Sequence, residues 1–173
     1  QHGCSLTFMA KPDQGWIGSS CHIHSSLWRD GKNAFAGESD VFCHYLAGQI
    51  ACLKELAVFV APTVNSYKRL KPGSTSSGAT WSPVWISYGY NNRTQMLRIP
   101  APGRIEDRTV DGSCNPYLAA AAVLASGLDG MAQQLDAGEP NAENLYSYSY
   151  EELTARGLKS LPANLLDSIG ELE

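Results

Sequence analysis

The longest regular hydrophobic pattern in this chain lies between residues 40 and 62. Apolar side chains recur there at helical spacing, at Phe42, Leu46, Leu53, Leu56 and Val60. Ser39 can cap the amino end of this run, Asp40 lies in its first turn, and Pro62 closes it. The pattern predicts one amphipathic helix that packs on a sheet.

Other stretches have the short patterns that are typical of strands. They are residues 4–9, 21–28, 84–90, 93–99 and 104–110. Beyond them, Asn115 and Pro116 are a favourable cap and first position for a helix that runs to about residue 135, with Gly138 as its stop. Shorter helices are predicted at 150–156, ended by Gly157, and at 162–173. Strands and helices without regular alternation predict an α+β fold, an antiparallel β-sheet flanked by helices.

Charge is distributed unevenly along the chain, which has 173 residues and a formal net charge of -4. No Asp or Glu occurs from Leu56 to Ile105, and this window holds Lys68, Arg69, Lys71, Arg93, Arg98 and Arg104. A cationic block in an acidic chain indicates a local anionic ligand, and arginine is well suited to phosphate or carboxylate. The alternative is a solvated basic loop region. The acidic net charge disfavours a nucleic-acid partner.

The composition indicates the cellular environment in which the protein is expected. No apolar run approaches the roughly 18–20 residues of a membrane-spanning helix, so no membrane association is predicted. The five cysteines are an odd number without CxxC spacing. They indicate neither a disulfide framework nor a zinc knuckle, and a reducing cytoplasm is the expected location.

Two predicted strands carry side chains that could do chemistry. Strand alternation places His22, His24 and Ser26 on one face. It also places Arg104, Glu106 and Arg108 on one face, where a carboxylate between two arginines would stay ionised and suit Mg2+ or Mn2+. The alternatives are an incidental histidine pair and a surface ion-pair ladder.

Two further points remain open from the residues alone. Arg93 and Arg98 differ by five positions, so a regular strand would place them on opposite faces unless a bulge intervenes. The HxH motif followed by Glu38 would also fit a cupin-like metal-binding barrel, against which the long predicted helices and the arginine block argue.

Several motifs resemble the glutamine synthetase family and together cover most of the chain. They are FMAKP (8–12), Gly18-Ser19 before HIHSSLW (22–28), NSYKRL (65–70), Pro72-Gly73, Asn92-Arg93, RIP (98–100), RIE (104–106) with Arg108, NPYL (115–118) and GLDG (127–130). The resemblance implies ATP-dependent ligation of ammonia or a substituted amine to the γ-carboxylate of L-glutamate through γ-glutamyl phosphate. It also implies Mg2+ or Mn2+ as cofactor, a cytoplasmic location and a ring-shaped, dodecamer-type homo-oligomer.

The resemblance also implies roles for individual residues. His22 and Glu106 match metal ligands. ATP-contacting positions are matched by His24, Ser26, Arg98 and Arg104. Arg93 and Arg98 match the arginines that clamp the transferred phosphoryl group. Positions that bind glutamate are matched by Gly18, Arg69 and Arg108.

Two departures from the family pattern bear on the amine. The usual Asn-Gly-Ser-Gly loop reads Ile17-Gly18-Ser19-Ser20, so its Asn is missing. The family's flap Glu after Pro-Gly falls on Thr75 or Trp81, depending on the alignment, and the window contains no acid. With Trp85, this segment resembles the branch of γ-glutamylmethylamide synthetases and other amine-ligating relatives. An amine other than ammonia is therefore expected.

The resemblance further implies that residues 1–173 are the C-terminal part of a catalytic domain. The family's carboxylate ligands of a further metal lie upstream of the Lys-Pro motif, before Gln1, and an N-terminal domain completes the site of a neighbouring subunit. The chain alone is accordingly expected to be inactive. The alternative is a noncatalytic structural relative, which the missing flap acid would permit.

Overall fold

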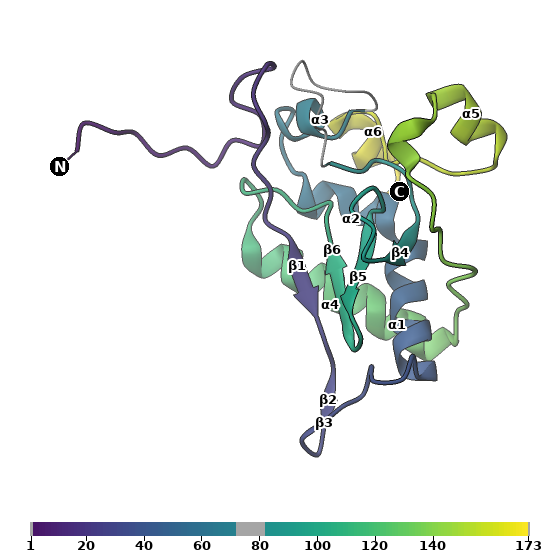
Figure 1. Cartoon of the computed structure of the whole chain (residues 1–173). Coiled ribbons are helices and arrows are strands. Elements are labelled where there is room, and N and C mark those ends of the chain that lie inside the picture. Colours follow the sequence, from purple (N-terminus) through teal and green to yellow (C-terminus); the bar gives the residue numbers. More distant parts are fainter. Residues whose placement is uncertain (1, 72–81, 173) are drawn as a thin grey trace.

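The computed structural model describes residues 2–71 and 82–172, so the flap positions Thr75 and Trp81 lie outside the described residues. The elements in chain order are β1 (Ile23–Ser25), β2 (Trp28–Arg29), β3 (Lys32–Asn33), α1 (Asp40–Ala51), α2 (Leu53–Val60), α3 (Ser66–Arg69), β4 (Tyr88–Tyr90), β5 (Leu97–Ala101), β6 (Arg104–Asp107), α4 (Pro116–Gln133), the 3-10 turn η1 (Leu145–Ser147), α5 (Tyr150–Ala155) and α6 (Leu165–Gly170). Figure 1 shows the strands in front of a layer of helices.

The main sheet has the strand order β1-β6-β5-β4. β6 is antiparallel to both β1 and β5, as predicted, but β4 and β5 are parallel. The reason is that residues 93–96, expected to be strand, form a turn instead. The backbone N–H of Leu97 donates to the carbonyl of Ser87, so β5 begins level with the start of β4. The sheet is therefore mixed at this edge.

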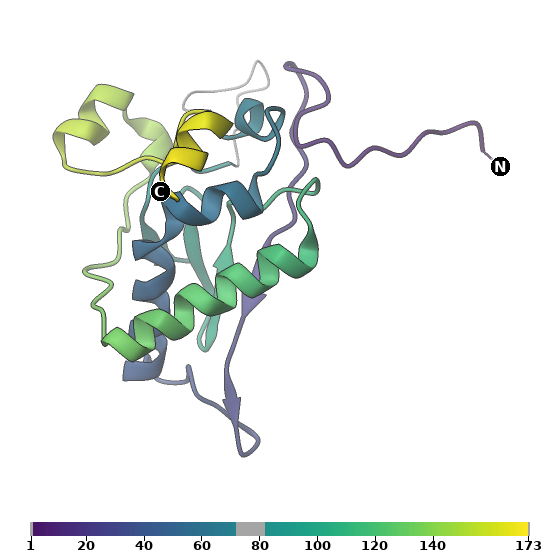
Figure 2. The same ribbon diagram turned by 180° about the vertical axis from the view of Figure 1, so that it is seen from behind.

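Helices α1 and α4 cover one face of the sheet, and Figure 2 shows α4 crossing in front of α1 when the molecule is seen from behind. The predicted caps are confirmed: Ser39 Oγ accepts from Phe42 N, and Asn115 Oδ1 accepts from Tyr117 N and Leu118 N. The single helix predicted over 40–60 is wrong. The chain breaks at Cys52 into α1 and α2, which are bent by 73°.

Glycine allows α1 and α4 to approach closely. A Cβ at Gly48 would lie 2.1 Å from the Ser126 carbonyl oxygen, and one at Gly130 would lie 2.3 Å from the His44 carbonyl oxygen. Large side chains such as Tyr45 and Leu97 complete the core between helices and sheet. This face of the sheet is therefore closed by packing.

The amino-terminal prediction was wrong in part. Residues 4–9 form no strand but an extended arm, on which Leu6 and Phe8 are exposed (Figure 1). The strand predicted over 21–28 is split into β1 and the short hairpin strand β2. Among the described residues, no single helix is long and apolar enough to cross a membrane, although the bent α1–α2 pair reaches that length and composition together.

Candidate active site

A row of polar side chains crosses the sheet face that α1 and α4 leave open. In the strand register, His24 of β1 lies opposite Glu106 of β6, and Glu106 lies opposite Arg98 of β5. Residues directly opposite one another across paired strands project from the same face. The neighbouring positions Asp107 and Leu97 project from the other face, toward the helices. Strand pairing thus gathers three chemistry-bearing side chains on one surface.

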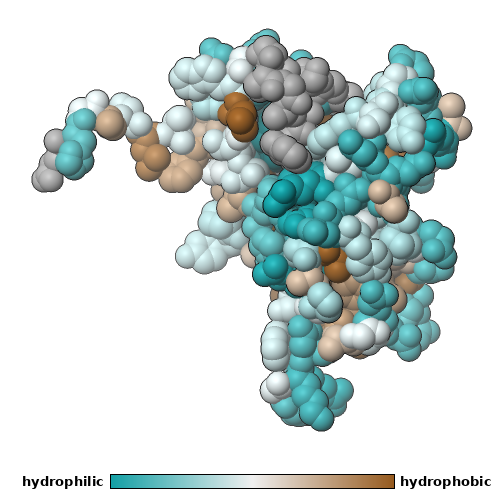
Figure 3. Space-filling view, in the orientation of Figure 1, coloured by the Kyte–Doolittle hydropathy of each residue, from teal (hydrophilic) through white to brown (hydrophobic). Residues whose placement is uncertain are grey.

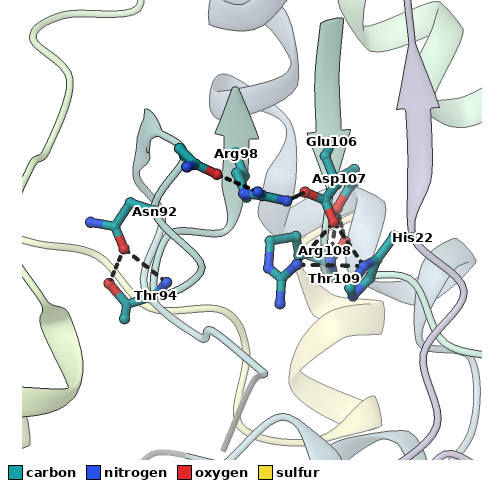
Figure 4. A network of polar contacts seen from close by, with 9 residues as sticks. His22, Asn92, Thr94, Arg98, Glu106, Asp107, Arg108 and Thr109 are labelled. Atoms are coloured by element: carbon teal, nitrogen blue, oxygen red, sulfur yellow. Dashed lines mark hydrogen bonds and ion pairs between the residues drawn. The ribbon is translucent and has the colours of Figure 1, made fainter. Parts of the chain in front are cut away.

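Glu106 is the centre of this arrangement, as Figure 4 shows. Its Oε2 accepts from Arg98 Nη1 at 2.8 Å, and its Oε1 accepts from Arg108 Nη1 at 2.9 Å. The Nδ1 atom of His22 lies 2.9 Å from the same Oε1 atom. Glu106 and Arg108 are buried, with only 3% of each residue exposed. The carboxylate is therefore a shielded anchor for two guanidinium groups and one imidazole.

The expectation that Arg104 and Arg108 flank Glu106 needs correction. Arg98, and not Arg104, pairs with Glu106 beside Arg108, because the β5–β6 register places Arg98 directly opposite Glu106. Arg104 is exposed at the start of β6. Arg93 is also exposed, in the turn between β4 and β5, and makes no ion pair with a described residue. Of the two arginines predicted as phosphoryl clamps, the structure brings only Arg98 into the Glu106 network.

Electrostatics keep this network in defined charge states. Burial by itself would raise the pKa of Glu106, but the hydrogen bond from Arg98 and the positive charge of Arg108 together lower it. Burial, followed by the charge of Arg108, lowers the pKa of His22 to about 4 even though Glu106 opposes that shift. Glu106 is thus ionised and His22 neutral near pH 7.

These two side chains fit the predicted divalent metal. A metal ligand must be a deprotonated carboxylate or a neutral imidazole, and both conditions hold here. The two side chains converge on one point of the open face, with His22 Nδ1 2.9 Å from Glu106 Oε1. Among the described residues, no group of three or more His, Cys, Asp or Glu side chains could hold a metal ion together, so this pair would supply only part of a coordination shell.

Arg69 and Gly18, both predicted to contact glutamate, are neighbours. A Cβ at Gly18 would lie 3.0 Å from Arg69 Cγ and 2.7 Å from the Ala10 carbonyl oxygen, so a larger residue would collide with them. Arg69 is buried in α3 and donates to Ser82 Oγ at 3.0 Å and to the Thr109 carbonyl oxygen. Burial lowers its pKa to about 10, which leaves the guanidinium charged at neutral pH.

The remaining predicted positions lie along the exposed side of β1 and β6. His24 is exposed on β1, and Ser26 is exposed just beyond it, where its Oγ accepts from Trp28 Nε1 at 3.0 Å. Together with Arg104 they could contact a nucleotide lying across the open face. Figure 3 shows the most hydrophilic surface gathered over the middle of this face.

Sequence reasoning missed two residues of this region. Asn91, in the turn after β4, accepts through Oδ1 from Arg98 Nη2. Its left-handed backbone, with φ 48°, was signalled only by the Asn-Asn pair, which is typical of turns. The charges of Arg108 and Arg69 act on Tyr146 in η1, whose pKa burial raises to about 12. No sequence pattern indicated that Tyr146 would lie near these arginines.

Comparison with known proteins places this geometry in a family. Residues 1–173 match the family described as glutamine synthetase, catalytic domain. The chain belongs to the glutamine synthetase family. This membership confirms both the α+β catalytic-domain class and the family predicted from the motifs, so the cupin alternative is wrong.

Individual relatives within the glutamine synthetase family support the predicted branch. The glutamate–methylamine ligase of Methyloversatilis universalis is 44% identical over 179 residues, covering 99% of this chain and 40% of the relative. The glutamine synthetase of Pyrococcus furiosus is 43% identical, covering 99% of this chain and 39% of the relative. A solved complex of GmaS with ADP has a TM-score of 0.86 and 46% identity, covering 96% of this chain and 39% of that one. The chain thus spans about 40% of the length of these relatives.

Proposed function

We propose that the full-length protein ligates an amine to the γ-carboxylate of L-glutamate at the expense of ATP, in the cytoplasm and as a ring-shaped homo-oligomer. ATP would phosphorylate the carboxylate to γ-glutamyl phosphate, and the amine would then attack the acyl carbon and displace inorganic phosphate. The observation that carries this proposal is the Glu106 network, in which Arg98 and Arg108 are held 2.8 Å and 2.9 Å from one carboxylate on the open sheet face.

The network suits phosphoryl transfer because it is organised before any substrate arrives. Catalysis of this reaction depends mainly on positioning and on stabilising negative charge at the transferred group. Arg98 has fixed acceptors on both Nη atoms, Glu106 and Asn91, and is only partly buried. Its guanidinium can therefore face an incoming phosphate without reorganising, while Arg93 would need to move inward from its exposed turn.

His22 and Glu106 would hold one Mg2+ or Mn2+ ion. When bound, that ion would neutralise phosphate oxygens and so lower the cost of bringing ATP beside glutamate. The chain's own part is to keep His22 neutral and Glu106 ionised, which the burial of His22 and the arginines beside Glu106 achieve. We propose that Arg69 and Arg108 bind the carboxylates of glutamate, and the lack of a side chain at Gly18 avoids a collision with Arg69.

The identity of the amine follows from the departures already described. The window after the Pro-Gly turn has no acid that could deprotonate an ammonium ion. We infer that the acceptor is a substituted amine such as methylamine. Sequence identity does not separate the two options, since the methylamine ligase and the glutamine synthetase are 44% and 43% identical to this chain.

The test measures phosphate release by the full-length protein with ATP, Mg2+ and L-glutamate, in parallel with ammonia, methylamine, ethanolamine and polyamines. Release with a substituted amine and little with ammonia is the expected result. An enzyme that used ammonia at least tenfold better than every other amine would contradict the proposed acceptor. Silence with all amines despite nucleotide binding would favour the noncatalytic relative instead.

We also propose that residues 1–173 alone are not a competent ligase. The described residues supply only a two-member donor pair for metal, His22 and Glu106, whereas the proposed reaction uses two metals. Purified 1–173 should show no amine-dependent phosphate release above a control without amine. Measurable release from the piece alone would overturn this expectation.

A further inference from the structure

A cavity outside the Glu106 network lies between the amino end of α1 and the outer end of β5. It has a volume of about 550 Å³, within the range typical of small-molecule sites. Its walls are mainly apolar, with few polar side chains. The lining residues are Gly37, Glu38, Phe42, Tyr90, Asn91, Ile99, Pro100, Ala101, Pro102 and Gly103.

A second hollow adjoins this cavity and shares Glu38, Phe42 and Tyr90 with it. It adds the carboxylates of Asp136 and Glu139. Neither hollow has a lysine or arginine among its described lining residues. The two form a continuous groove, which we call the α1–β5 groove, with an apolar floor and only negative formal charge.

The backbone holds two lining side chains in place. Glu38 and Asn91 have φ of 53° and 48°, and they are two of the four described non-glycine residues with positive φ. Such conformations cost roughly 1–3 kcal/mol and tend to occur where a structure fixes a functional side chain. Burial, and then a hydrogen bond with Glu38, raises the pKa of Tyr90 to about 12. The Glu38 carboxylate thus lies beside the Tyr90 hydroxyl, and both residues line the cavity and its neighbouring hollow.

We propose that the α1–β5 groove binds a small organic cation, an ammonium group joined to a short apolar or aromatic body. The apolar body fills the space between Phe42, Ile99 and Ala101. The ammonium group pairs with Glu38 and lies near the face of Tyr90, which attracts a cation through its ring electrons. A neutral ligand would leave the negative charge of Glu38 uncompensated, and an anion would be repelled by three acidic side chains.

This site is distinct from the proposed ligase site but touches it through one residue. Asn91 lines the cavity and also accepts a hydrogen bond from Arg98. The proposal does not depend on which reaction the protein catalyses, because binding in the groove is measured without ATP or glutamate.

The test is calorimetric titration of the full-length protein with phenethylamine, with 2-phenylethanol as a neutral analogue and 3-phenylpropionate as an anionic one. The variants are Glu38→Gln, which removes the charge, and Ala101→Trp, which fills the cavity. Glu151→Gln removes an exposed acid on α5, outside the groove, and is the matched control. Thermal unfolding of each variant verifies that it is folded.

Phenethylamine should bind more tightly than either analogue. Glu38→Gln should weaken it about fivefold, the upper range for an exposed ion pair. Ala101→Trp should abolish binding, and Glu151→Gln should leave it unchanged. Equal affinity for all three compounds, or equal amine affinity in Glu38→Gln and the wild type, would overturn the proposal. So would an absence of binding.

Discussion

Glu106 and Asp107 are consecutive carboxylates on one strand, and the sheet separates them completely. Glu106 lies on the open face with Arg98 and Arg108 on its oxygens. Asp107 lies on the helix-covered face, where Thr109 supplies the donors to Oδ1 and Oδ2 has no hydrogen-bond partner among the described residues. The pKa of Glu106 is lowered, whereas burial raises the pKa of Asp107.

The difference shows that the same chemical group becomes a site or a core residue according to what covers its face. On the open face, arginines replace the water that an ionised carboxylate needs. On the covered face, α1 packs closely against α4, and among the described residues the donors that reach Asp107 directly are the uncharged N–H and hydroxyl of Thr109. Substitutions on the open face are therefore expected to reduce activity, and substitutions on the covered face are expected to reduce stability.

The substitution on the open face with the largest expected effect is Glu106→Gln, which removes the negative charge between Arg98 and Arg108. It should lower kcat about 10²–10³-fold, as removal of a preorganised electrostatic group typically does. It should also destabilise the fold by about 3 kcal/mol, because two shielded guanidinium groups lose their counter-ion. Steady-state phosphate release and chemical unfolding of the full-length protein measure the two effects.

Glu143→Gln is the matched control for that substitution. Arg156 Nη1 lies 2.8 Å from Glu143 Oε2, the same separation as in the Arg98–Glu106 pair, but the two side chains are 43% and 51% exposed. Its removal should cost less than about 1 kcal/mol and leave kcat unchanged. If both variants had similar effects, burial would not be what makes the Glu106 pair important.

On the covered face, Gly48→Ala should disturb the packing of α1 against α4 most directly. The added Cβ would lie 2.1 Å from the Ser126 carbonyl oxygen and 2.7 Å from the backbone of Gly130, so α1 and α4 must separate. Such overpacking typically costs about 1–3 kcal/mol. Chemical unfolding should show this loss, and Gly170→Ala should not, because a Cβ there meets nothing within 4 Å. Equal stability of the two variants would contradict the packing argument.

Asn91 allows the open face to be examined more finely, as a positioning residue for Arg98. Asn91→Gly keeps the left-handed backbone but removes the oxygen that accepts from Arg98. It should lower kcat about tenfold, the equivalent of one hydrogen bond to a charged group. Asn91→Asp keeps an acceptor and should restore kcat to within about twofold. A purely structural role would instead lower the unfolding temperature of both variants and leave kcat unchanged.

Local sequence signals predicted the parts of this molecule that depend on near neighbours. Ser39 and Asn115 begin helices because their side chains accept from backbone groups two or three residues away. The alternation of side chains along a strand likewise predicted that Glu106 and Arg108, two residues apart, lie on one face. The motifs shared with glutamine synthetases identified the family, because they depend on residue identities and not on where helices and strands begin and end.

Contacts between distant segments could not be read in this way. The turn at residues 93–96 returns the chain beside β4 and so pairs Arg98, rather than Arg104, with Glu106. The break at Cys52, where α1 and α2 are bent by 73°, interrupts a helical periodicity that continues through both helices, so the periodicity gave no sign of it. Asn91 and Tyr146 approach the arginines only after the sheet and η1 are assembled.

The smallest expected effect, and the most direct test of the comparison, is the pH dependence of Asp107→Asn. A carboxyl group whose pKa is raised by folding binds its proton more tightly in the native state, so its contribution to stability is lost as pH rises through that pKa. Asn cannot ionise. The unfolding free energy of Asp107→Asn minus that of the wild type should therefore become more positive between pH 4 and pH 8, whatever its constant offset. For Glu106→Gln the sign is opposite and the pH window is lower, because the lowered pKa of Glu106 stabilises the wild type as pH rises from the folded pKa to the unfolded one, about 4.3, and adds a constant amount above it. If the two difference curves sloped in the same direction, the two faces of β6 would not be electrostatically distinct.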